Sequence, residues 1–151
     1  MNADDATRLR RVIAKLAREL NSSSTGTGLT SSQASVLGLI SVHGPVGLSE
    51  LSDLEGLNPT MLSRVISKLH NQGLIVRIPD PTDLRTASVV CTPAGKRVHR
   101  QVKARRAAAV ARSLRVLPPE QASLLTQALP ALEAFAEAMR QEGLNDSLVS
   151  S

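Results

Sequence analysis

The sequence predicts a mainly α-helical fold of six helices with a small β-hairpin, and two to three short strands in all. Apolar residues recur at helical spacing through most of the 151 residues, which indicates amphipathic helices. Two short apolar runs, 74–78 and 87–91, flank an eight-residue loop and predict the hairpin. Hydrophobic residues make up 42% of the chain and charged residues 21%, a balance typical of a folded domain.

The first predicted helix covers residues 5–20, and Asp4 or Asp5 can cap its start. A polar loop over 21–28 follows, because Ser, Thr, Asn and Gly dominate it. The apolar residues of this helix recur at helical spacing, namely Leu9, Ile13, Leu16 and Leu20.

Two shorter helices are predicted next. One opens at Thr30 with Gln33 three positions later, which is a capping-box pattern, and ends near 44–45. The other is capped by Ser49 and runs through Glu55. The side chains expected to point inward are Val36, Leu37, Ile40, Leu51 and Leu54.

The fourth predicted helix, 59–71, is amphipathic. Asn58 caps it, Pro59 occupies its first position, and Gly73 supplies a left-handed stop. Its apolar face consists of Leu62, Val65, Ile66 and Leu69. Its other face carries hydroxyls and cations but no acid, namely Thr60, Ser63, Arg64 and Lys68. Such a face suits a DNA groove better than a solvated surface, which usually mixes acids with bases.

Two long helices follow the hairpin. The fifth starts at a Thr92-Pro93 cap and reaches about Leu114, and the sixth covers about 119–141, where Pro130 should kink or split it. The sixth helix has one apolar stripe, formed by Leu125, Leu129, Leu132, Ala136 and Met139, which favours dimer packing.

Positive charge is concentrated in the middle of the chain. Residues 58–115 hold twelve basic and two acidic side chains, a net charge of +10, whereas the whole chain carries +5. A clustered positive block is expected of a protein that binds a polyanion. Phe135 is the single aromatic residue, so the chain cannot build the stacked aromatic platform that single-strand binders use.

Together, two short helices joined by a tight turn and followed by a hairpin predict a winged helix-turn-helix. The order and spacing of its motifs resemble the MarR-type transcriptional regulators over about residues 5–140. The motifs that carry this resemblance are 29–37, 44–51, 60–75, 80–85 and 92–95.

The resemblance implies a homodimer that binds a palindromic promoter operator in double-stranded DNA, most simply as a repressor released by a small-molecule effector. It divides the chain into a dimerisation helix and loop (1–28), a DNA-binding region (29–92) and C-terminal dimerisation helices (93–151). It implies pairing of subunits through the stripes of the first and sixth helices, Leu9, Ile13, Leu16, Leu125, Leu129, Leu132 and Met139.

The resemblance also assigns DNA contacts. It places Thr60, Ser63, Arg64 and Lys68 in the major groove and the wing, 79–86, in the minor groove. Arg85 at the wing tip would enter that groove, held by Asp83. Ser49 and Pro59, near the starts of the third and fourth helices, complete the predicted DNA-binding set.

Alternatives remain at this point. The basic surface could instead dock an acidic protein, or Cys91 could make the regulator redox-responsive, although a lone Cys in an apolar run favours a buried structural thiol. The bases of the fifth helix, Lys96, Arg100 and Lys103, favour a solvated face that steers DNA. We expect no cofactor, no metal site and no enzyme activity, because no catalytic or metal-ligand spacing appears. We expect a cytoplasmic protein, because no membrane-length apolar run or signal peptide is apparent.

Overall fold

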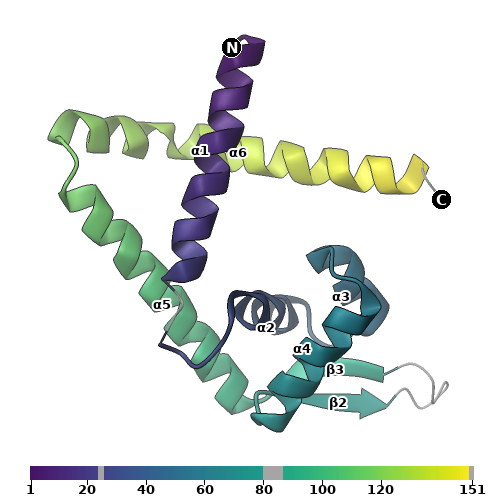
Figure 1. Cartoon of the computed structure of the whole chain (residues 1–151). Helices are drawn as coiled ribbons and strands as arrows, with labels where there is room; N and C mark the ends of the chain where they lie inside the picture. The colour runs from purple at the N-terminus through teal and green to yellow at the C-terminus, as the bar shows by residue number, and fades with distance from the viewer. Residues whose placement is uncertain (24–25, 80–86, 150–151) are drawn as a thin grey trace. The chain divides into compact units, whose positions relative to one another are not determined.

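The computed structural model describes residues 1–23, 26–79 and 87–149 (Figure 1). Within them the fold is mainly α-helical with a small antiparallel sheet, as predicted. Its elements are α1 (Ala3–Ser22), α2 (Ser31–His43), β1 (Val46–Gly47), α3 (Leu48–Glu55), α4 (Pro59–Asn71), β2 (Ile75–Pro79), β3 (Ala87–Cys91), α5 (Pro93–Arg115) and α6 (Pro119–Val149).

The sheet has the order β1-β3-β2, and both pairings are antiparallel. β2 and β3 form the predicted hairpin, in register from Ile75 opposite Cys91 to Pro79 opposite Ala87. β1 adds two residues to the other edge of β3, with Val46 opposite Val89. The sheet therefore holds the base of the wing, while the wing tip lies outside the described residues.

One apolar core joins α2, α3 and α4 to the sheet and to the start of α5. Its fully buried side chains are Val36, Leu37, Ile40, Val46, Leu51, Ile66, Leu69, Ile75, Val89 and Val102. The predicted inward faces of α2 and α4 are confirmed, but the prediction for Leu54 is wrong, because that side chain is 47% exposed. α3 has only eight residues and buries Leu51 alone.

Helix caps follow local chemistry in most places. The Thr30–Gln33 capping box forms, and the Asn58 side chain accepts a hydrogen bond from the Met61 N–H at 2.8 Å. Two predicted caps are wrong. Asn2, rather than Asp4 or Asp5, caps α1, and its partner in a capping box is Asp5. Gly47 precedes α3 without a side-chain cap, which leaves Ser49 inside the helix.

The first turn of α5 is locked against the segment that follows α4. The Thr92 hydroxyl donates to the Gly73 carbonyl at 2.6 Å, and the Thr92 N–H donates to the Leu74 carbonyl at 3.0 Å. Thr92 Oγ1 also accepts from the Gly95 N–H at 3.1 Å, which confirms the predicted cap. A Cβ on Gly95 would lie 2.0 Å from the Leu74 oxygen, so only glycine fits there.

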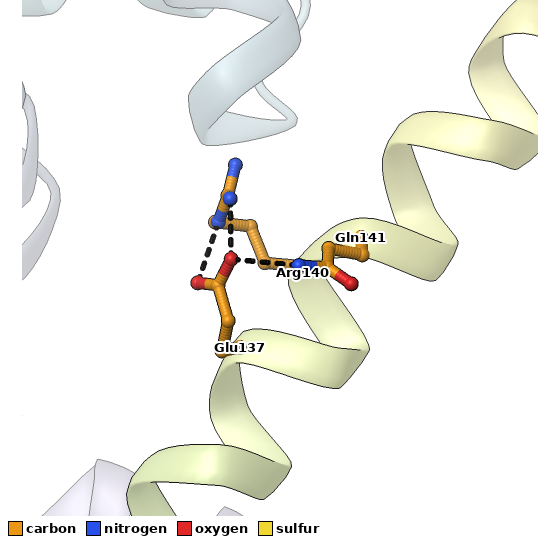
Figure 2. A network of polar contacts seen from close by, with 3 residues as sticks. All are labelled: Glu137, Arg140 and Gln141. Atoms are coloured by element: carbon orange, nitrogen blue, oxygen red, sulfur yellow. Dashed lines mark hydrogen bonds and ion pairs between the residues drawn. The ribbon is translucent and has the colours of Figure 1, made fainter.

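The chain forms two compact units, Met1–Val110 and Ala111–Ser151. In the second unit, α6 continues through Pro130 to Val149, so the predicted end near 141 and a split at Pro130 are both wrong. On the exposed surface of α6, the Glu137 carboxylate accepts hydrogen bonds from Arg140 and Gln141, and the bond from Arg140 Nε measures 2.9 Å (Figure 2). These bonds lower the pKa of Glu137 to about 2.

Candidate nucleic-acid interface

α4 is fixed in one orientation by its apolar face. Leu62, Ile66 and Leu69 are at most 2% exposed and pack into the core beside α2, α3 and β2. Asn58 caps the first turn, which begins at Pro59, and α4 ends at Asn71. Gly73, just beyond the C-cap, has a φ of 72°, a left-handed conformation that turns the chain away from the helix axis. The polar face of α4 is consequently exposed. Figure 1 shows the path of this helix across the hairpin.

The exposed face of α4 contains a shallow groove that brings together the four residues predicted to enter the major groove of DNA. Its lining residues are Thr60, Ser63, Arg64, Ser67, Lys68 and Asn71. This lining offers three hydroxyls, an amide, a guanidinium and an ammonium, and no carboxylate. Hydroxyls and Lys suit phosphate oxygens, whereas the planar guanidinium of Arg suits the two acceptors of a guanine edge.

A second pocket, of about 340 Å³, lies where α3 meets α4. Its lining residues are Leu48, Ser49, Ser52, Asp53, Pro59, Leu62 and Ser63. The pocket thus brings together Ser49, Pro59 and Ser63, the last of which also borders the α4 groove. The Ser52 hydroxyl is already used, because it donates to the Leu57 carbonyl at 2.6 Å and fixes the turn between the helices.

All six predicted DNA-contacting residues that the structure describes are exposed. The other two, Asp83 and Arg85, fall on the wing tip, outside the described residues. Sequence reasoning missed Ser67 and Asn71, which complete the lining of the groove. Their spacing was the available signal: Ser67 follows Ser63 by four residues, and Asn71 follows Ser67 by four more, so all three share a helix face.

Cys91 is the last residue of β3, the central strand of the sheet. Its side chain is 8% exposed, and its thiol lies 3.7 Å from the Leu37 carbonyl, to which it donates a hydrogen bond. Burial raises the pKa of the Cys91 thiol, against smaller opposing effects of Ser41 and Lys96. Because the thiolate is the reactive form, these features favour a structural thiol.

His99 on α5 packs its ring against Gly38 of α2, where a Cβ would lie 3.3 Å from the ring carbon Cε1. Its Nδ1 is buried and has no hydrogen-bond partner among the described residues. Burial lowers the pKa of His99, and the charges of Lys103 and Arg106 lower it further. Within the described ranges, no group of three or more His, Cys, Asp or Glu residues could hold a metal ion.

Six of the seven residues predicted to pair subunits are exposed in the single chain, and the seventh, Leu9, is half-buried. α1 buries none of its side chains, and Ile13 and Leu16 are exposed. On α6 the exposed apolar side chains include Leu125, Leu129, Leu132, Phe135 and Met139. Among the described residues, no helix is both long enough and apolar enough to cross a membrane.

A helix pair with a tight turn, a buried apolar face, an exposed cationic face and a hairpin behind it together define a winged helix-turn-helix protein. Residues 29–87 match the family model described as MarR family. This region is similar to the DNA-binding part of the MarR family, and the fold of the chain is that of solved MarR-family transcriptional regulators, a family whose members are not enzymes.

Solved structures agree over most of the chain. RV1404 from Mycobacterium tuberculosis is 28% identical, with 89% of this chain and 94% of that chain covered and a TM-score of 0.69. A MarR-family transcriptional regulator from Rhodococcus sp. RHA1 is also 28% identical, with 90% and 96% covered and a TM-score of 0.66. The transcriptional regulator Tm0710 from Thermotoga maritima is similar in fold, at 24% identity, 89% and 98% coverage and a TM-score of 0.71. A comparison with curated protein sequences gives no match.

Proposed function

We propose that this protein is a homodimeric repressor that binds a palindromic operator in double-stranded DNA. The observation that carries the proposal is the acid-free groove on the exposed face of α4, where Arg64 and Lys68 stand among hydroxyls. In this proposal α4 enters the major groove, Arg64 reads a base edge, and Lys68 and the hydroxyls bind phosphates. Asp83 and Arg85 of the wing act at the adjacent minor groove.

The exposed apolar stripes of α1 and α6 support the dimer. Uncovered Leu, Ile and Met side chains at helical spacing are expected to pack against a partner. A twofold dimer presents two copies of α4 to two half-sites about one helical turn, roughly 10 base pairs, apart. Repression then follows from occupation of a promoter, and release by a small-molecule effector completes the proposed regulation.

The proposal is tested by titrating the protein into labelled duplex DNA enriched from a random library, at several salt concentrations. We expect the affinity to fall steeply between about 50 and 200 mM salt, because binding neutralises phosphates and releases counterions. The same strand without its complement is the control. It should bind more weakly, because the chain has one aromatic residue and no stacking platform.

The experiment also separates the two other functions considered. A protein-docking surface predicts that an acidic polypeptide binds tightly while duplex DNA gives no defined footprint. A redox-responsive regulator predicts that peroxide releases the bound duplex, and that Cys91→Ala abolishes the response. The burial of Cys91 and the raised pKa of its thiol argue against the redox response.

A further inference from the structure

A second cationic surface lies on α5, apart from the groove of α4. The sequence between Pro93 and Arg115 contains eight cations and no acid. Four of the cations, Lys96, Arg97, Arg100 and Lys103, are exposed on the side of the helix opposite Val98 and Val102. We call these four residues the α5 ridge.

The ridge is unfavourable for an isolated helix. Lys96 and Arg100 are four residues apart, and Arg100 and Lys103 are three apart, so like charges face each other. Lys96 and Arg97 also follow closely on the N-terminus of α5, where the helix dipole disfavours cations. Within residues 1–23, 26–79 and 87–149, none of the four forms an ion pair with a carboxylate. An anionic partner would relieve all of these repulsions.

The position of the ridge indicates which anion it meets. Thr92 and Gly95, just before Lys96, contact the backbone of Gly73 and Leu74. Those two residues follow α4 closely, so the ridge begins beside the C-terminal end of the helix with the DNA-binding groove (Figure 1). A duplex seated on α4 extends past that end of the helix, and its phosphates are then the nearest polyanion to the ridge.

We propose that the α5 ridge binds phosphates of the DNA backbone flanking the half-site that α4 reads. This inference rests on the proposed function and adds to it an interaction that carries no base information. Its contribution is to position the winged-helix unit on the duplex, and to strengthen binding to any sequence at the flanks.

The test compares two double variants of the whole protein. Arg100→Gln with Lys103→Gln removes two ridge cations, and Arg112→Gln with Arg115→Gln removes two cations further along the same helix. Two probes are made from a duplex that the wild-type protein enriches from a random library. The short probe contains the enriched motif alone, and the long probe has about one helical turn of DNA added on each side. Affinity is measured against salt concentration for each protein and each duplex.

On the long duplex, the ridge variant should make the dependence of log affinity on log salt shallower by about 1.8 per subunit, or about 3.6 for the bound dimer, since each phosphate that is no longer neutralised accounts for about 0.9. The control variant should leave the slope of the wild type unchanged. The affinity gain that flanking DNA gives the wild type should disappear in the ridge variant. Equal salt slopes for both variants would overturn the proposal that the ridge binds phosphates, and so would an undiminished affinity gain from flanking DNA in the ridge variant. Neither result would contradict DNA binding by α4. A wild-type protein that enriches no duplex would instead overturn the proposed function itself.

Discussion

Arg64 is the residue on which sequence-specific recognition is expected to depend. It stands on the exposed side of α4, and Leu62 and Ile66 on the other side anchor the helix in the core. The guanidinium is therefore presented by a rigid element, and a bidentate pair with guanine contributes about 1–3 kcal/mol of discrimination.

We expect Arg64→Ala to weaken binding to the selected duplex by about 1–3 kcal/mol, and to relax the preference for one base pair in each half-site. Lys68→Ala is the matched comparison, because Lys68 lines the same groove. As a phosphate ligand it should weaken binding to every sequence alike and make the salt dependence shallower by about 1 for each subunit of the bound dimer. Gel-shift titration against single-base-pair variants checks both. Equal weakening on all sequences for Arg64→Ala would contradict base reading.

Cys91 gives a second prediction. Because burial raises the pKa of its thiol, the thiol stays protonated at neutral pH and should react slowly with iodoacetamide in the folded protein. The raised pKa means that the native state holds the proton more tightly than the unfolded state. Its contribution to stability is complete below the ordinary value of 9.0 and is lost as the pH rises through the higher folded value.

The measurement for Cys91 compares alkylation rates with and without urea, and urea melts at pH 8 and pH 10. Fast labelling in the absence of urea, or a stability unaffected by pH over this range, would show an accessible thiol. Oxidant-sensitive DNA binding would then become the better account of the residue.

Single residues also show where sequence reasoning reaches its limit. Thr30 and Asn58 cap their helices as predicted, because the cap depends only on the next three residues. Ser49 does not cap α3, because β1 pairs with β3 and lets the helix start directly at Leu48. Leu54 points to solvent for a similar reason: how α3 packs depends on partners distant in sequence, so helical spacing alone could not settle it.

At the scale of elements, α5 links the end of the wing to the rest of the chain, and its entry angle depends on one close approach. Gly95 lies against the Leu74 carbonyl, in the turn that follows α4. The Thr92 cap could be predicted from neighbouring residues. The contact of Gly95 with the Leu74 backbone could not, because the two residues are 21 positions apart and no local pattern connects them.

We expect Gly95→Ala to destabilise the protein by about 1–3 kcal/mol, because the new methyl group overlaps the Leu74 backbone. Gly143→Ala is the matched control in α6, where a Cβ meets nothing within 4 Å. Helix propensity favours Ala there by about 0.5–1 kcal/mol. Urea melts of the two variants give the comparison, and similar stabilities would mean that α5 does not pack on Leu74 in solution.

α6 shows the opposite case. Pro130 lacks the N–H of a helix interior and predicts a kink or a split, yet the helix is not split there and continues to Val149. The strong helix formers on both sides, Ala, Leu, Glu and Gln, offset the missing hydrogen bond. The helix propensity of the neighbouring residues and the cost of Pro130 act in opposite directions. The sequence pattern alone does not show which of the two is larger.

At the scale of the whole molecule, the fold class, element order and the α4 face could be predicted, because each follows from short-range spacing. The proposed dimer involves a second chain, and the observation that supports it is the exposed apolar surface of α1 and α6. We expect light scattering to give about twice the 16.0 kDa mass of one chain. Leu132→Glu should lower that mass, whereas Val42→Glu, on exposed α2 surface, should not. A monomeric wild type would remove the twofold operator.

The central claim is that α4 reads duplex DNA, and selection from a random duplex library tests it most directly. Wild-type protein should enrich an inverted repeat whose half-sites are centred roughly 10 base pairs apart. The same selection with Arg64→Ala should yield a degenerate position in each half. Enrichment of no motif by the wild type, or of the same motif with equal strength by Arg64→Ala, would contradict the account.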